Sequence, residues 1–185
     1  MEKGLIPEII NSFHIYKGTG NETGLETEKA GEQFLGLSGE IVLPELNALT
    51  ETISGSGILG EIEVGNPGHF SPIDMEIPFI SVCNDMFQFS TTEYNTIILR
   101  MTQQSTVKLT RAKTYENMKV VVGGTMKSMK VGTVKIGGQM GSSVTLSVTY
   151  LVISVNGKEV LALDKINEVY RVNGKDQLEK IRKYS

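Results

Sequence analysis

Residues 144–163 read VTLSVTYLVISVNGKEVLAL, and this stretch decides the fold class. A run rich in β-branched residues precedes Asn156-Gly157, and a shorter alternating run follows it. Asn-Gly is the pair that two-residue hairpin turns favour, because both positions need a positive φ. The sequence therefore predicts an antiparallel hairpin with strands at residues 144–155 and 158–163.

Other stretches predict further strands. The longest covers residues 97–110, where every second residue from position 100 onward is polar: Arg100, Thr102, Gln104, Thr106, Lys108 and Thr110. The positions between them are mixed, because Gln103 and Ser105 interrupt the apolar residues Leu99, Met101, Val107 and Leu109. Shorter strands are expected at residues 13–16, 37–46, 118–122 and 131–136, and Pro44 should interrupt or end the second of these.

Residues 60–64 alternate between charged and apolar side chains. Ile62 and Val64 are therefore predicted to face a core. Glu61 and Glu63 should face away from it. The next residues, Gly65-Asn66-Pro67-Gly68, are typical of a turn.

Two short helices are predicted. Asn84 is placed to cap a helix within residues 83–89. Near the C-terminus, Asp176 and Glu179 have the capping-box spacing, which predicts a helix at about 176–184. Together these patterns predict a mainly β chain, mostly antiparallel, in one domain spanning residues 1–185. Its N-terminal segment should be extended, and a polar, glycine-rich loop is expected at about 18–32.

Composition narrows the class of protein. Of the 185 residues 39% are hydrophobic, and the 20 glycines without any Trp favour strands joined by turns over a helical bundle. No apolar stretch is long enough for a transmembrane helix, and the N-terminus lacks the basic start and apolar run of a signal peptide. Cys83 is the only cysteine, which excludes an internal disulfide framework and points to a reducing cytoplasm.

The net charge of −3 is unevenly distributed. Residues 1–95 contain 15 acidic and 3 basic residues, a net charge of −12, whereas residues 96–185 contain 6 acidic and 15 basic residues, a net charge of +9. One interpretation is local pairing of the two halves within a domain. The other is a dipolar subunit whose acidic face meets the basic face of a neighbour, as head-to-tail assembly requires.

Motifs for catalysis or cofactor binding are weak. Residues 55–60 match the dinucleotide pattern G-x-G-x-x-G, but a strand pattern follows where a helix is needed, so a glycine-rich bend or interface loop is favoured. His14 and His69, the two histidines, lack a metal-ligand spacing, and Cys83 has no evident base partner. The lysines of residues 118–136 come without interleaved aromatic residues, which disfavours specific nucleic-acid binding. No catalytic residue, metal or cofactor is predicted.

The C-terminal segment carries a family resemblance. Residues 155–164 read VNGKEVLALD and residues 172–178 read VNGKDQL, so a strand pair around an Asn-Gly turn leads to an Asp and then to a V-N-G-x-D segment before the final helix. In this order the segment resembles the end of the major tail tube proteins of contractile-tailed phages. Ile6-Pro7, residues 39–44 and the glycine-rich residues 54–60 agree with that family, whereas the polar stretch at 18–32 is longer.

The resemblance implies two packed antiparallel sheets, forming a β-sandwich or barrel with one or two short helices. It implies six subunits per ring, rings stacked into a hollow tube, and one sheet from each subunit joining a continuous barrel around the lumen. The implied partners are other copies of the chain, a tail sheath protein, and baseplate and tape-measure proteins. The tube would be a conduit for DNA, which would pass through without specific binding, or would serve membrane puncture; no membrane anchor is expected. The implied location is a virion tail or phage-tail-like particle that is assembled in the bacterial cytoplasm.

The resemblance suggests candidate residues for the lumen wall and for the contacts between subunits. Acidic groups would repel DNA phosphate from the lumen wall, and the candidates are Glu40, Glu61 and Glu63, although ordinary solvent-facing carboxylates are an equal alternative. A helix as short as the C-terminal one must dock on its own domain or on a neighbouring subunit to persist in water. Candidate assembly contacts are therefore Asn173, Gly174, Asp176, Leu178, Ile181 and Arg182. The alternative function is a monomeric β-sandwich that binds a carbohydrate or small ligand, with an enzyme third; the lack of Trp and the 12 Phe and Tyr residues disfavour a ligand module.

Overall fold

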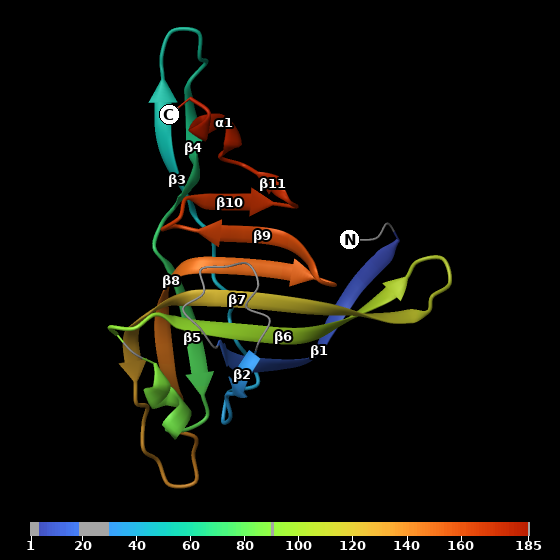
Figure 1. Ribbon diagram of the computed structural model, residues 1–185, viewed down its shortest axis with the longest axis vertical. Coiled ribbons are helices and arrows are strands. Elements are labelled where there is room, and N and C mark those ends of the chain that lie inside the picture. The colour runs from blue at the N-terminus through green and yellow to red at the C-terminus, as the bar shows by residue number, and fades with distance from the viewer. Residues whose placement is uncertain (1–3, 19–29, 90, 185) are drawn as a thin grey trace.

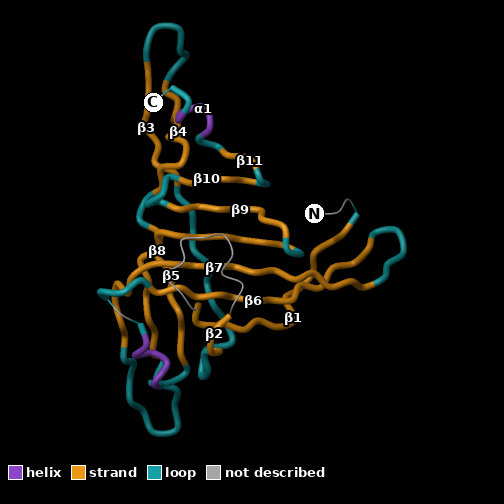
Figure 2. Tube along the Cα trace, in the orientation of Figure 1, coloured by secondary structure: helices purple, strands orange, loops and turns teal. Residues whose placement is uncertain are grey.

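The computed structural model describes residues 4–18, 30–89 and 91–184, and β-strands dominate it (Figures 1 and 2). In chain order the elements are β1 (Leu5–Gly18), β2 (Ala30–Gln33), β3 (Ala48–Ser54), β4 (Glu61–Phe70), β5 (Ile73–Phe79), the 3-10 helix η1 (Asn84–Gln88), β6 (Asn95–Val107), β7 (Lys113–Lys130), β8 (Ser142–Val155), β9 (Lys158–Asp164), β10 (Val169–Val172), β11 (Lys175–Asp176) and α1 (Glu179–Arg182). The mainly β prediction with one or two short helices is confirmed.

Nine strands form one antiparallel sheet. Its order is β11-β10-β9-β8-β7-β6-β1-β2, and β5 pairs with β8 beside this path. From β6 to β11 each strand pairs with the next along the chain, whereas β1 crosses the sequence to pair with β6. β3 and β4 form a second sheet of two strands.

The large sheet folds over itself at a corner in β7 and β8. The register of this pair shifts between Gly123 and Gly124, and a methyl group on Gly124 would come within 2.0 Å of the backbone oxygen of Ser147. Beyond the corner, β5 and the adjoining halves of β7 and β8 run across the other strands (Figure 1). A glycine at the corner therefore lets two backbones approach closely enough for the sheet to turn.

The main core lies between these two layers, which gives the sandwich-like packing expected from the sequence. It joins buried side chains of β5 and β8, such as Ile77 and Leu146, to buried side chains of β6 and β7, such as Leu99 and Val122. A smaller buried cluster on the other face of the sheet contains Ile98, Val121, Val152 and Ala162. Side chains on both faces of β6 are therefore buried near its start, and successive residues there are apolar.

The hairpin around Asn156-Gly157 is confirmed. β8 and β9 pair up to Val155 and Lys158, and both turn residues have positive φ, 51° and 76°. The side chain of Asn156 also accepts a 2.9 Å hydrogen bond from the backbone N–H of Asn117. The turn is thus attached to the neighbouring strand β7 as well as closed on itself.

Several strand predictions need correction. The strand at 13–16 extends over 14 residues as β1, and that at 118–122 belongs to the much longer β7. Residues 37–46 contribute only an isolated bridge between Leu37 and Phe79, and residues 131–136 lie in a loop rather than a strand. The predicted polar loop at 18–32 lies mostly outside the described residues, while Gly18 ends β1 and β2 begins at Ala30.

The turn and cap predictions also change. Residues 65–68 do not reverse the chain but form a bulge within β4, because Ala48 pairs with Phe70 whereas Thr50 pairs with Gly65. The helix at 83–89 is the 3-10 helix η1, for which Cys83 rather than Asn84 is the N-cap residue and makes no side-chain cap bond. The helix at 176–184 shrinks to the four residues of α1, since Asp176 belongs to β11.

Candidate assembly surface

The β3–β4 hairpin projects from the body of the molecule (Figure 1). All seven residues of β3 are exposed. Ile53 pairs with Ile62 and Glu51 pairs with Val64, so these four side chains share one face of the hairpin. The other face carries Thr52 beside Glu63 and Ser54 beside Glu61. The hairpin therefore has one largely apolar face and one polar, acidic face.

The prediction that Ile62 and Val64 face a core is wrong for the chain taken alone. Each keeps 46% of its surface exposed. A two-stranded hairpin is at best marginally stable in water, and three strands or a packing partner are usually needed. The alternation identified an apolar face correctly, but no core formed by the described residues of the same subunit covers it. Leu59, in the glycine-rich bend at the hairpin tip, is also fully exposed.

The opposite end of the long axis carries another exposed apolar segment, the loop of residues 131–141 (Figure 1). Val134 and Ile136 are exposed on it. Backbone hydrogen bonds order the loop: the N–H of Thr133 donates to the carbonyl of Met140, 2.8 Å, and the N–H of Met140 donates to the carbonyl of Ile80, 3.1 Å. Residues 127–141 contain three lysines and no acidic residue.

The three lumen candidates do not lie together. Glu61 and Glu63 share the polar face of the hairpin, whereas Glu40 precedes β3 and lines a groove of about 560 Å³ beside β1. Other residues of this groove include Ile10, Phe13, His14, Ile41 and Leu43.

The C-terminal candidates make contacts within the subunit. Asn173 and Gly174 form the turn between β10 and β11. Asp176 forms an ion pair with Arg182 and accepts a 2.9 Å hydrogen bond from the backbone N–H of Leu178. Arg182 also donates to the backbone carbonyl of Glu168, 3.2 Å. Leu178 is half-buried beside Gly68, and Ile181 remains 47% exposed.

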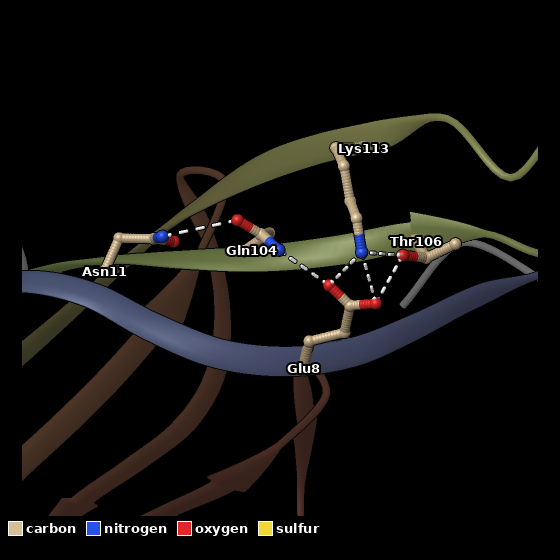
Figure 3. A network of polar contacts seen from close by, with 5 residues as sticks. All are labelled: Glu8, Asn11, Gln104, Thr106 and Lys113. Carbon is tan, nitrogen blue, oxygen red and sulfur yellow. Dashed lines mark hydrogen bonds and ion pairs between the residues drawn. The ribbon is translucent and has the colours of Figure 1, made fainter.

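A polar network fastens the N-terminal part of β1 to β6 and β7 (Figure 3). Glu8 and Asn11 are the extra residues of two bulges in β1. Lys113 Nζ donates to both carboxylate oxygens of Glu8 at 2.6 and 2.7 Å, and Thr106 and Gln104 donate to them at 2.5 and 2.7 Å. Asn11 donates in turn to Gln104 Oε1, 3.3 Å. The hydrogen bonds from Lys113, Thr106 and Gln104 lower the pKa of Glu8 from 4.5 to about 2.

Glu8→Gln is expected to lower the free energy of unfolding at pH 7. The difference from the wild-type chain should become smaller as the pH falls. The folded-state pKa of Glu8, about 2, lies below the ordinary 4.5, so its carboxylate stabilises the fold above pH 4.5 and this contribution is lost as the pH falls toward 2. Urea unfolding of both chains from pH 7 to pH 3 measures the difference. Glu76→Gln, at an exposed position of β5, is the control. A difference that stays constant over this range would contradict the assignment.

Metal sites and membrane spans are not evident in the described part of the chain. Residues 4–18, 30–89 and 91–184 contain no cluster of three His, Cys, Asp or Glu side chains arranged to hold a metal ion. The helices within these ranges are too short to cross a bilayer.

Comparison with known proteins identifies a family and a relative. The family described as "Phage tail tube protein FII" matches residues 26–184, which is most of the chain. The tail tube protein of Escherichia phage P2 is 26% identical over 157 residues, covering 83% of this chain and 89% of that protein. The family match begins after β1 and extends through the β3–β4 hairpin, the long strands β6, β7 and β8 and the C-terminal segment. The chain therefore belongs to the phage tail tube family, as a structural subunit of a tail tube.

Proposed function

We propose that this subunit forms hexameric rings that stack head to tail into the inner tube of a contractile tail. The proposal combines the family with one observation, the projecting hairpin whose apolar face is exposed in the single chain. A hairpin of this kind gains stability when a second copy covers Ile53, Ile62 and Val64. Repeating the same contact from copy to copy produces an open stack rather than a closed dimer.

The loop of residues 131–141 is the surface that suits this hairpin in the next copy. It lies at the opposite end of the subunit and offers Val134 and Ile136 as apolar partners. Glu51 lies on the apolar face of the hairpin, and Lys135 lies in the loop between Val134 and Ile136. Opposite charges would therefore meet at the edge of an apolar contact, which favours one orientation of stacking.

Within a ring, the large sheet would join the sheets of neighbouring subunits into one barrel around the lumen. Its terminal strands provide edges for such pairing, and closure removes edges that otherwise invite aggregation. The tube has no catalytic residue and no cofactor in this proposal. A sheath outside it, a baseplate below it and a tape-measure protein within it complete the tail, which is assembled in the bacterial cytoplasm.

The lumen role of Glu61 and Glu63 requires that the β3–β4 hairpin, which is not part of the large sheet, line the lumen between stacked barrels. Both lie on the hairpin face opposite Ile62 and Val64, so docking through the apolar face leaves them accessible. Carboxylates at the wall would repel phosphate and keep DNA mobile. Glu40 lies beside β1 instead, and its place at the lumen is a separate part of the proposal.

Negative-stain microscopy of the purified chain tests the proposal. Hexameric rings or hollow tubes of uniform width are expected. Glu51→Lys should abolish stacking, because it places a cation opposite the lysines of residues 127–141.

The double variant Glu61→Lys with Glu63→Lys should leave tubes intact and make them retain DNA.

Two results would contradict these expectations. A monodisperse monomer by light scattering at all protein and salt concentrations would overturn the tube. Loss of tubes in the Glu61 and Glu63 double variant would place these two residues at a subunit contact instead of the lumen.

A further inference from the structure

The base of the projecting hairpin is held from one side by the C-terminal part of the chain. Lys165, in the turn between β9 and β10, donates through Nζ to the backbone carbonyls of Phe70 and Ser71 at 3.2 and 2.8 Å. The rings of Phe70 and Tyr170 meet edge to face with their centroids 5.2 Å apart. These contacts lie where β4 leaves the body of the molecule.

A further contact lies at the bulge of β4. Gly68 has a φ of +78°, and a methyl group on it would come within 2.8 Å of Leu178 Cδ2. Leu178 therefore packs directly on the bulge backbone. Figure 1 shows α1, which follows Leu178, beside β4. The bulge interrupts the β3–β4 register between Thr50 and Ala48, so it is the place where the hairpin can bend relative to the body.

Both contacting residues are themselves fixed by local structure. The carboxylate of Asp164 accepts hydrogen bonds from the backbone N–H groups of Ile166 and Asn167, both 3.0 Å, which shapes the turn that carries Lys165. Partial burial lowers the pKa of Lys165, since its ammonium is withdrawn from water. Leu178 is oriented by the hydrogen bond from its backbone N–H to Asp176.

We propose that Lys165 and Leu178 are positioning residues that set the direction of the β3–β4 hairpin, so that stacking depends on them although they need not touch the next copy. The inference rests on the proposed stacking function. It assigns the C-terminal segment a role inside the subunit: a rigid, correctly aimed hairpin docks without first losing conformational freedom. A loosely held hairpin would lose that advantage at every contact along the tube.

Hydrogen exchange on the unassembled full-length chain tests the inference separately from assembly. In Lys165→Met and Leu178→Ala, amides of residues 48–70 should exchange about tenfold faster, while amides of β6, β7 and β8 keep their protection. Lys165→Arg, which retains a cationic donor, should restore most of the protection. Lys158→Met and Leu109→Ala change an exposed lysine and an exposed leucine away from the hairpin and serve as controls. Tube yield is then measured by microscopy and should fall for Lys165→Met and Leu178→Ala but not for Lys165→Arg.

Three results would overturn the inference. Unchanged exchange in residues 48–70 would show that these contacts do not hold the hairpin. Faster exchange throughout β6 to β8 would show that the two residues belong to the core. A loosened hairpin with normal tube yield would show that its direction does not govern stacking. If the wild-type chain forms no tubes, the proposed function fails, and the exchange data on the hairpin remain interpretable.

Discussion

A chain that ends at Asn173 is expected to fold with a cooperative thermal transition and to form no tubes. The deletion removes the residues after Asn173, and none of the described ones, 174–184, belongs to either buried core cluster. Leu178 and Ile181 are the main apolar side chains lost, and each is worth at most roughly 1.5–3 kcal/mol when fully buried. Both are partly exposed, so the loss is small beside the roughly 5–15 kcal/mol that stabilises a typical domain.

Assembly should suffer because the deletion takes away the side chain that packs on the β4 bulge. Circular dichroism melts report folding, and negative-stain microscopy reports tubes. A chain that ends at Lys183 keeps α1 and both ends of the Asp176–Arg182 ion pair, and it should assemble normally. Normal tubes from the Asn173 chain would refute the role of the C-terminal segment. An unfolded product would show that the segment belongs to the core.

Gly124→Ala is expected to destabilise the fold strongly. The new methyl group would lie 2.0 Å from the backbone oxygen of Ser147, and a backbone atom cannot move aside as the end of a flexible side chain can. Over-packing usually costs about 1–3 kcal/mol, and this contact should reach or exceed the upper value. For a chain of this size about 3 kcal/mol corresponds to a fall in Tm of roughly 6–12 °C.

The matched control for this substitution is Gly39→Ala. A methyl group at Gly39 meets no atom within 4 Å, and the residue is not among those with positive φ. Its Tm should stay close to that of the wild-type chain. Equal melting temperatures for Gly124→Ala and Gly39→Ala would mean that the corner of β7 and β8 accommodates a larger residue, and that the close approach is not required for the sheet to turn.

Local signals predicted the parts of the fold that depend on neighbouring residues. Asn156-Gly157 predicted its turn because the turn needs two consecutive positive φ angles, which Asn and Gly adopt more readily than other residues. The long β6 was recognisable because its polar parity continues from Arg100 to Thr106 on one face. β1 was predicted only as a strand at residues 13–16 after an extended segment, since the bulges at Glu8 and Asn11 each shift the side-chain alternation and make it irregular.

The remaining wrong predictions have a common physical cause: a sequence pattern does not show which segment or which subunit a residue contacts. The alternation around Ile62 and Val64 marks an apolar face, but it is the same whether a core or another subunit covers that face. Asp176 has the spacing of a helix cap. In the structure, however, it lies in β11 opposite Arg171 of β10, and its carboxylate forms an ion pair with Arg182. The contact between Leu178 and Gly68 joins residues more than a hundred positions apart, so no local window contains it.

The strand order of the large sheet also determines when each strand can pair during synthesis. β6 to β11 follow one another as neighbours, so each hairpin can close soon after its second strand leaves the ribosome. The N-terminal half of β1 pairs with β6, with Leu5 opposite Val107, so it emerges about a hundred residues before its partner. At about 5–20 residues per second this interval lasts roughly 5–20 seconds, during which Ile6, Ile9 and Ile10 lack the strand that will adjoin them. We therefore expect the isoleucines of β1 to be accessible to chaperones on the nascent chain until β6 emerges.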